Sequence, residues 1–322
     1  IVHACMLPGM DFLGSAIMGN TPKVGLISPN TTFMVVLGCM FGKFVPILEA
    51  AEKQWLKTGA VAHCGMVKSR VGLISLGLIP KPDLTITSGY LCETSPKVNE
   101  ILEQVYGIPA CFVDTMEDRE LREYPDASRA TAFAAKSMRA ASGRIERETG
   151  FGITDDMLWK VLEGRRPFDE AMSRVYGLIR SADPVPLGST HLNLLMAVGC
   201  ISFTGNQLAE TVEILDTLYE ELLDRSRRGI GITPKGAPRV FGMFPNHHSD
   251  PRWEYQANRA GLAVVAFDFQ NASELAGSET AIVDRNDPYE VIVQNLHGSM
   301  TQPLGGRIAI VLDSCRRLRV DG

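Results

Sequence analysis

The spacing of hydrophobic residues in the first half of the chain predicts alternating strands and helices. Residues 81–87 (KPDLTIT) form an apolar run closed by Ser88-Gly89, which is typical of a short buried strand. Residues 95–107 place apolar side chains at helical spacing and end on Gly107, a residue suited to a helix C-cap. A second buried strand is predicted directly afterwards, over residues 108–115. This strand–helix–strand order predicts a parallel sheet with a right-handed crossover.

The rest of the chain is first helical and then mixed again. Residues 124–228 are rich in helix formers, and Thr154 can cap a helix over residues 153–164. A strand pattern returns near Pro238, and Gly261 stands where it can cap the helix before it. The expected elements there are strands at 238–245 and 262–269 and helices at 252–261, 287–300 and 307–322.

This pattern predicts an α/β protein with two parallel-sheet domains joined by helices. The expected divisions are an N-terminal segment at 1–22, a first α/β domain at 23–123, a helical connecting region at 124–230 and a second α/β domain at 231–322. The first core is expected to include Leu84, Ile86, Ile101, Val105 and Phe112. The second domain has few strands for its class, so we expect it to be incomplete and the polypeptide to continue past Gly322.

Composition and charge narrow the class of partner. The 322 residues are 45% hydrophobic and 21% charged, which is ordinary for a globular protein of two domains. A net charge of −5 argues against nucleic-acid binding, which needs a basic face. The most apolar stretch, from Phe33 to Leu48, contains Lys43 and Pro46, so no membrane span is expected. With no signal peptide pattern at Ile1, we expect a cytoplasmic protein.

Seven cysteines in such a chain indicate thiols or metal ligands rather than a disulfide framework. None forms a C-x-x-C pair, which excludes zinc ribbons and ferredoxin-type runs. Cys39, Cys111 and Cys200 lie in apolar runs and are interpreted as small buried hydrophobic residues.

Cys64 and Cys92 are the candidate ligands. Cys92 follows the strand at 81–87, on a loop that leads into a helix, where amide groups favour a thiolate or an anionic ligand. Cys64 precedes Gly65 and stands near Lys68 and Arg70, which also favour a thiolate. Both cysteines are expected near one edge of one sheet, so a shared metal site and two buried structural thiols are both open interpretations.

Other motifs give weaker evidence for a functional site. His247 and His248 could bind a metal with Asp250 and Asp268, but adjacent side chains on an extended segment point to opposite sides. We therefore interpret the two histidines as surface or substrate-facing loop residues. No dinucleotide fingerprint, Walker A motif or zinc-protease motif occurs in the chain.

The order of segments from about Pro29 onward resembles the 2-hydroxyacyl-CoA dehydratase and benzoyl-CoA reductase family of iron–sulfur subunits. The matching stretches are AHCGMVKSRVGLI, then IPKPDLTITSGYLCETSPKVNEILEQVYGIPACFVDT, PRVFGMFPN, RAGLAVVAFDF, DRNDPYEVI and RIAIVLDSCRRLRVDG. The resemblance implies two Rossmann-like (flavodoxin-like) domains with a [4Fe–4S] cluster between them. It also implies a related second subunit, an ATP-dependent iron–sulfur activator or other low-potential electron donor, and an acyl-CoA substrate that receives single electrons.

By this resemblance, Cys64 and Cys92 are the first and second cluster ligands. The family's third cysteine would lie beyond Gly322, while Cys315 stands earlier, on the last helix, and does not match. A dehydratase (a lyase) and a ring reductase (an oxidoreductase) both stay open. The alternatives are a non-catalytic subunit that is a structural partner in a larger complex, and an electron-relay protein acting on other small molecules.

Overall fold

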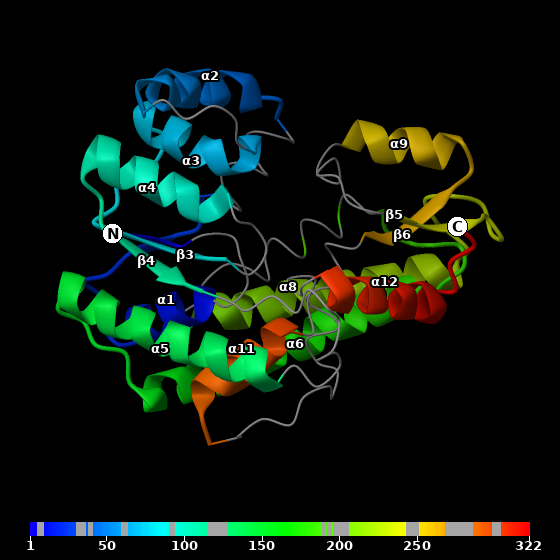
Figure 1. Cartoon of the computed structure of the whole chain (residues 1–322). Coiled ribbons are helices and arrows are strands. Elements are labelled where there is room, and N and C mark those ends of the chain that lie inside the picture. The colour runs from blue at the N-terminus through cyan, green and yellow to red at the C-terminus, as the bar shows by residue number, and fades with distance from the viewer. Residues whose placement is uncertain are drawn as a thin grey trace.

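The computed structural model has an α/β architecture with two separate parallel sheets in the part of the chain that it describes (Figure 1). The described residues are 1–4, 10–29, 37, 41–58, 64–89, 94–114, 128–188, 191, 195, 206–242, 251–267, 286–297 and 304–322. The α/β class predicted from the pattern is confirmed. Among the helices in these ranges, none has the combination of length and apolar character that a bilayer crossing requires.

The first sheet has four parallel strands in the order β2-β1-β3-β4. These strands are β1 (Val2–Ala4), β2 (Leu26–Ile27), β3 (Leu84–Ser88) and β4 (Ala110–Val113). In the central pair His3 stands opposite Thr85, and Thr85 stands opposite Ala110 on the other side. Strand β1 comes from the expected N-terminal segment, so that segment contributes to the first sheet, while the domain divisions stay a prediction.

Helices cover both faces of this sheet. On one face lie α1 (Met10–Met18), α5 (Ser128–Thr149) and α11 (Pro288–His297); on the other lie α3 (Gly65–Ser75) and α4 (Thr94–Tyr106), with α2 (Phe44–Trp55) and the 3-10 turn η2 (Leu56–Thr58) outside them (Figure 1). The alternation of strand side chains explains the layers, because Leu84 and Ile86 point into a buried cluster with α1 and α5 residues. Gly107, at a φ of 65°, ends α4 as predicted.

The second sheet contains β5 (Arg239–Gly242) and β6 (Ala263–Phe267), which are parallel. Helix α9 (Pro251–Arg259) stands between them in the chain and is followed by Gly261 at a φ of 81°, as predicted. Helices α8 (Asn206–Arg227) and α12 (Leu304–Leu318) complete this half. After α12 the chain comes beside β5, where the Asp321 amide donates to the Arg239 carbonyl and the Phe241 amide donates to the Gly322 carbonyl.

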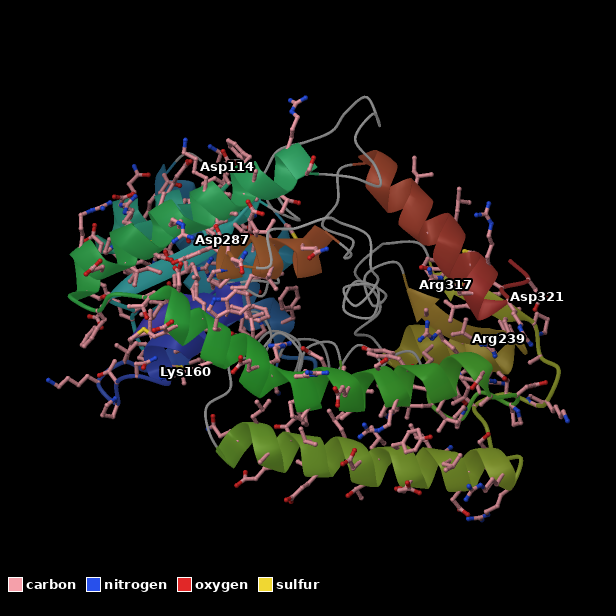
Figure 2. All side chains as sticks on the ribbon, turned by 90° about the horizontal axis from the view of Figure 1, so that it is seen from below. Asp114, Lys160, Arg239, Asp287, Arg317 and Asp321 are labelled. Carbon is pink, nitrogen blue, oxygen red and sulfur yellow. The ribbon has the colours of Figure 1, made fainter. Side chains whose placement is uncertain are left out.

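One helix, α6 (Asp155–Ser181), joins the two halves. The Thr154 hydroxyl accepts a hydrogen bond from the Met157 amide at 3.3 Å, which confirms the predicted N-cap. The helix continues far beyond residue 164, where the sequence interpretation ended it. Its early residues pack into the first core and its later residues into the second, and Figure 2 shows it running beneath both halves, with α8 alongside.

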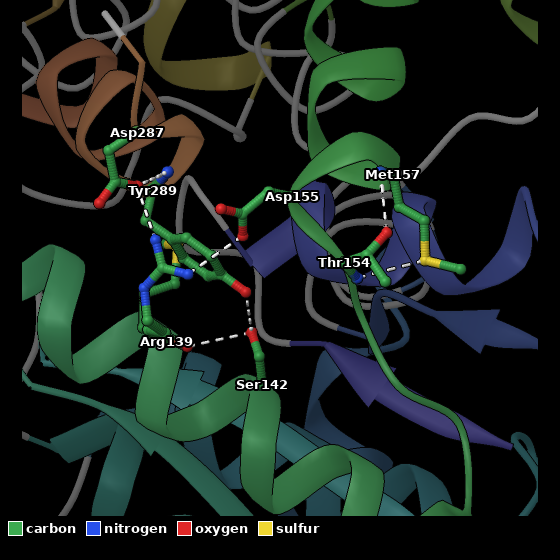
Figure 3. Close-up of polar contacts among 8 residues, drawn as sticks. Arg139, Ser142, Thr154, Asp155, Met157, Asp287 and Tyr289 are labelled. Carbon is green, nitrogen blue, oxygen red and sulfur yellow. Dashed lines mark hydrogen bonds and ion pairs between the residues drawn. The ribbon is translucent and has the colours of Figure 1, made fainter. Parts of the chain in front are cut away.

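Helix α11 also crosses between the halves, because it follows β6 in the chain but packs on α5 and α6. Figure 3 shows the contacts that hold it. The Arg139 guanidinium pairs with Asp155 and Asp287, each at 3.0 Å, and its central carbon lies 4.2 Å from the centre of the Tyr289 ring. The buried Tyr289 hydroxyl donates to the Ser142 hydroxyl at 3.1 Å, and burial raises the pKa of Tyr289. We call this group of five residues the α11 clasp.

The expected first core is confirmed in part. Leu84, Ile86 and Ile101 are buried, and Val105 is partly buried against the cluster beneath α4. The prediction for Phe112 is wrong, because its side chain is 40% exposed. On β4 the neighbours Cys111 and Val113 point toward α1 and α5, so the side chain of Phe112 stands on the opposite face, near the open end of the sheet.

Candidate functional site

The carboxyl ends of β3 and β4 form the edge of the first sheet where a ligand is expected. Figure 1 shows both arrowheads directed toward the middle of the molecule, on the side where the second sheet lies. At this edge the Gly89 amide donates to the Val113 carbonyl at 3.0 Å, which keeps the two strand ends paired. A Cβ at residue 89 would stand 3.2 Å from the Phe112 ring, so the absence of a side chain there lets the ring lie across the strand end.

Cys64 stands directly before α3 and begins that helix. Its carbonyl accepts hydrogen bonds from the amides of Val67 and Lys68, both at 3.1 Å. Its half-buried side chain packs against the cluster that includes Val67 of α3 and Val98 of α4. Cys64 is therefore a free cysteine at a helix N-terminus, next to the helix that follows β3.

Cys92 lies outside the described residues, as do His247, His248, Asp250 and Asp268. The ends of the Cys92 loop are nevertheless placed, because β3 ends at Ser88 and α4 begins at Thr94. The loop therefore leaves and re-enters the structure at the same sheet edge, and α4 packs on α3, the helix that follows Cys64. Whether the thiols of Cys64 and Cys92 meet stays a prediction.

Lys68 and Arg70, the two cationic residues near Cys64 in the sequence, interact with other groups. The Lys68 ammonium pairs with the Glu52 carboxylate of α2 and lies 5.6 Å from the centre of the Trp55 ring. The Arg70 side chain is fully buried, and its charge acts on His3 in the sheet. The feature that sets Cys64 apart is therefore its position directly before α3 rather than a nearby cation.

The remaining described cysteines belong to other environments. Cys111 is fully buried in β4, and burial raises the pKa of its thiol to about 11, which confirms its interpretation as a buried hydrophobic residue. Cys315 is half-buried on α12, near Leu318 of the second core, and burial raises the pKa of its thiol too. Among the residues whose positions are described, no three His, Cys, Asp or Glu side chains gather as a metal site.

His3 is a buried titratable group at the centre of the first sheet. Its side chain is fully buried, and desolvation, together with the positive charge of Arg70, lowers its pKa to about 3. The imidazole is therefore neutral in the folded protein at neutral pH, whereas an unfolded chain binds a proton near pH 6.5.

We expect His3 to make the protein less stable in mild acid. Below pH 6.5 the unfolded state binds a proton at His3 that the folded state does not bind. The stability that neutral His3 allows is therefore fully present above pH 6.5 and is lost as the pH falls toward 3. Between pH 7 and pH 5 this one group should lower the free energy of unfolding by about 2 kcal/mol. Urea unfolding of the wild type and of His3→Gln at both pH values measures the difference. An equal loss in the two proteins would show that His3 is not the group responsible.

The chain matches one known family over most of its length. The model of the family described as 2-hydroxyglutaryl-CoA dehydratase, D-component, matches residues 18–322. The matched range runs from the last residue of α1 to Gly322, so it contains β2 to β6 but not β1, and it includes Cys64, Cys92 and Cys315. No individual curated protein matches the chain.

Proposed function

Because the chain belongs to the 2-hydroxyglutaryl-CoA dehydratase D-component family, and is thereby a component of a dehydratase-type enzyme, we propose that it is the subunit that holds the cluster. In this proposal Cys64 and Cys92 ligate a [4Fe–4S] cluster, and the substrate is an acyl-CoA thioester. The observation that carries the proposal is the position of Cys64. It starts α3 beside α4, the helix that the Cys92 loop enters from the carboxyl edge of the sheet.

The residues present fit an anionic cluster. Thiolates are the usual protein ligands of iron–sulfur clusters, and the Cys64 thiol is only half-buried. The N-termini of α3 and α4 add two sets of amide groups near the two cysteines, and both favour negative charge. When bound, the cluster would supply single electrons at low potential to the substrate.

The rest of the site is proposed from the family. A third cysteine is expected beyond Gly322, while Cys315 is a weaker candidate because it stands on α12, against the second core rather than beside α3. The match to a dehydratase component favours the lyase over the ring reductase. The proposed partners are a related second subunit and an ATP-dependent iron–sulfur activator or other low-potential electron donor, all in the cytoplasm.

Substitution of the ligands tests the proposal. Iron bound per chain, measured in protein purified without oxygen, should fall strongly in Cys64→Ser and in Cys92→Ser, because a serine hydroxyl is a poor replacement for a thiolate. Cys39→Ser and Cys111→Ser are the matched controls and should keep their iron. Cys315→Ser should also keep it if the third ligand lies elsewhere. Full iron content in both the Cys64 and the Cys92 variants would exclude these residues as ligands.

The wild-type protein separates this function from its alternative. A chain that carries no iron under the same conditions, and still forms a complex with a related subunit, would instead be a non-catalytic structural partner. A chain that carries iron but does not change its spectrum with any acyl-CoA would favour an electron relay.

A further inference from the structure

We propose that α6 is a hinge, bending between Gly164 and Pro167, and that this bending changes the separation of the two sheets. In both sheets the carboxyl ends of the strands face the middle of the molecule, and α6 runs beneath both sheets (Figures 1 and 2). A change in the angle of α6 therefore moves the proposed cluster edge of the first sheet relative to β5 and β6.

The residues in the middle of α6 weaken it at one place. Pro167 has no N–H, so the carbonyl of Glu163 lacks its usual donor within the helix. Gly164, three residues earlier, is the other residue type that helix interiors disfavour. Packing does not require this glycine, because no atom lies within 4 Å of the place where a Cβ would stand. Glu163, Gly164 and Pro167 are all exposed, so water can solvate the freed backbone groups when the helix bends.

The weak point coincides with the boundary between the two cores. Before it, Leu158, Val161 and Leu162 pack in the first core with α1 and α5. After it, buried residues from Phe168 to Ile179 pack in the second core with α8 and β6. Each half of α6 is therefore held by a different body, and the segment from 163 to 167 is the part that neither core holds tightly.

Helix α8 belongs to the second body. Figure 2 shows α8 alongside α6. The two helices run in the same direction, because the segments that follow them meet where the Ile232 amide donates to the Val185 carbonyl. Asp216 of α8 pairs with Arg174 of α6. The two helices rise by the same distance per residue. Asn206 of α8 and Gly164 of α6 each lie ten residues before this pair, so they stand about level. The described part of α8, from Asn206 onward, therefore runs beside the weak point and the second-core half of α6, and its core residues pack in the second core.

Two further contacts are compatible with bending. The Arg165 guanidinium lies 5.2 Å from the ring centre of Phe12 in α1 and 5.1 Å from that of Phe168, so it touches both bodies through ring faces that tolerate sliding. Helix α11, which also crosses between the halves in the described part of the chain, is tied by the α11 clasp to α5 and to the first turn of α6. It therefore moves with the first body.

The hinge itself does not depend on the proposed function. Only the cluster and the acyl-CoA substrate at the edge of the first sheet rest on that proposal. A measurement of distance rather than of activity therefore tests the hinge, whether or not the protein holds iron.

Distances between one label on each body provide the test. Labels attached through a non-natural amino acid at the exposed positions Lys57 and Lys235 avoid the native thiols, and pulsed electron resonance on the full chain gives the distribution of their separation. The double variant Gly164→Ala/Pro167→Ala restores an unbroken helix. We expect its distribution to be about twofold narrower than that of the wild type.

Gly177→Ala is the matched control, because Gly177 lies in the same helix, also has open space around its missing Cβ, and stands wholly within the second body. Its distribution should equal that of the wild type. Gly164→Ala alone should give an intermediate width, which keeps the test informative if the double variant folds poorly. Equal widths in wild type, Gly164→Ala and Gly177→Ala would overturn the hinge, as would equal narrowing by the two single glycine substitutions.

Discussion

Gly72→Ala should lower the free energy of unfolding by about 3 kcal/mol, because α2 and α3 cross at this glycine with their backbones almost in contact. A Cβ at residue 72 would stand 2.0 Å from the carbonyl oxygen of Ile47 and 3.0 Å from its side chain. Backbone cannot rotate away as a side chain can, so the two helices must separate. Chemical denaturation followed by circular dichroism measures the loss.

Gly143→Ala in α5 is the control for this change. Its Cβ would come no closer than 3.7 Å to another atom, the tip of the Arg147 side chain. Alanine is the better helix former, so this variant should gain up to about 1 kcal/mol. Because α3 begins at Cys64, Gly72→Ala should also disturb the proposed ligand. A Gly72→Ala protein as stable as the wild type would mean that the two helices are not packed this closely.

Arg239→Met should cost roughly 3 kcal/mol and loosen the second half of the protein first. The Arg239 guanidinium donates to three backbone carbonyls, those of Leu318 at 2.9 Å, Ala182 at 3.1 Å and Arg180 at 2.6 Å. These carbonyls lie at the C-terminal ends of α12 and α6, where helices leave acceptors without intrahelical partners. Burial lowers the pKa of Arg239, and the neighbouring Asp183 and Asp321 oppose that shift.

Two other substitutions show whether the shape or the charge of Arg239 matters. Arg239→Lys keeps the charge but cannot reach three carbonyls with one ammonium group, so it should still lose about 2 kcal/mol. Arg228→Met removes an exposed arginine that follows α8 directly and pairs with Asp224, one turn earlier, and should cost less than about 0.5 kcal/mol. Hydrogen exchange should show faster opening of α12 in both Arg239 variants. If the amides of α12 still exchange slowly and the stability stays near the wild-type value, contacts other than those of Arg239 hold the end of α12.

Local signals in the sequence predicted local structure well. Thr154 caps α6 and Gly107 ends α4 because each effect depends on residues within one turn. Features that depend on distant partners were missed. Strand β1 is only three residues long and exists through its pairing with residues near 26 and 84. Arg239 gives no signal either, because its acceptors come from residues 180, 182 and 318.

The long helix shows a different limit. Gly164 and Pro167 are ordinary signals for a helix end, and the predicted helix stopped there. Packing on two cores carries α6 through both residues, so tertiary contacts outweigh local preference. At the candidate site, residue type and loop position were enough to select Cys64. The start of α3 at that residue, and the pairing of Lys68 with Glu52, required the structure.

The return of α11 to the first sheet has a consequence for the order in which the chain can fold during synthesis. Tyr289, Ile292 and Val293 of α11 are buried in the first core together with Val2 of β1. A ribosome must therefore release the chain through Val293 before this core can close, because residues of β1 and residues of α11 meet in it. Nascent chains that end before Asp287 leave an apolar face of α5 uncovered, which is the kind of surface that chaperones bind.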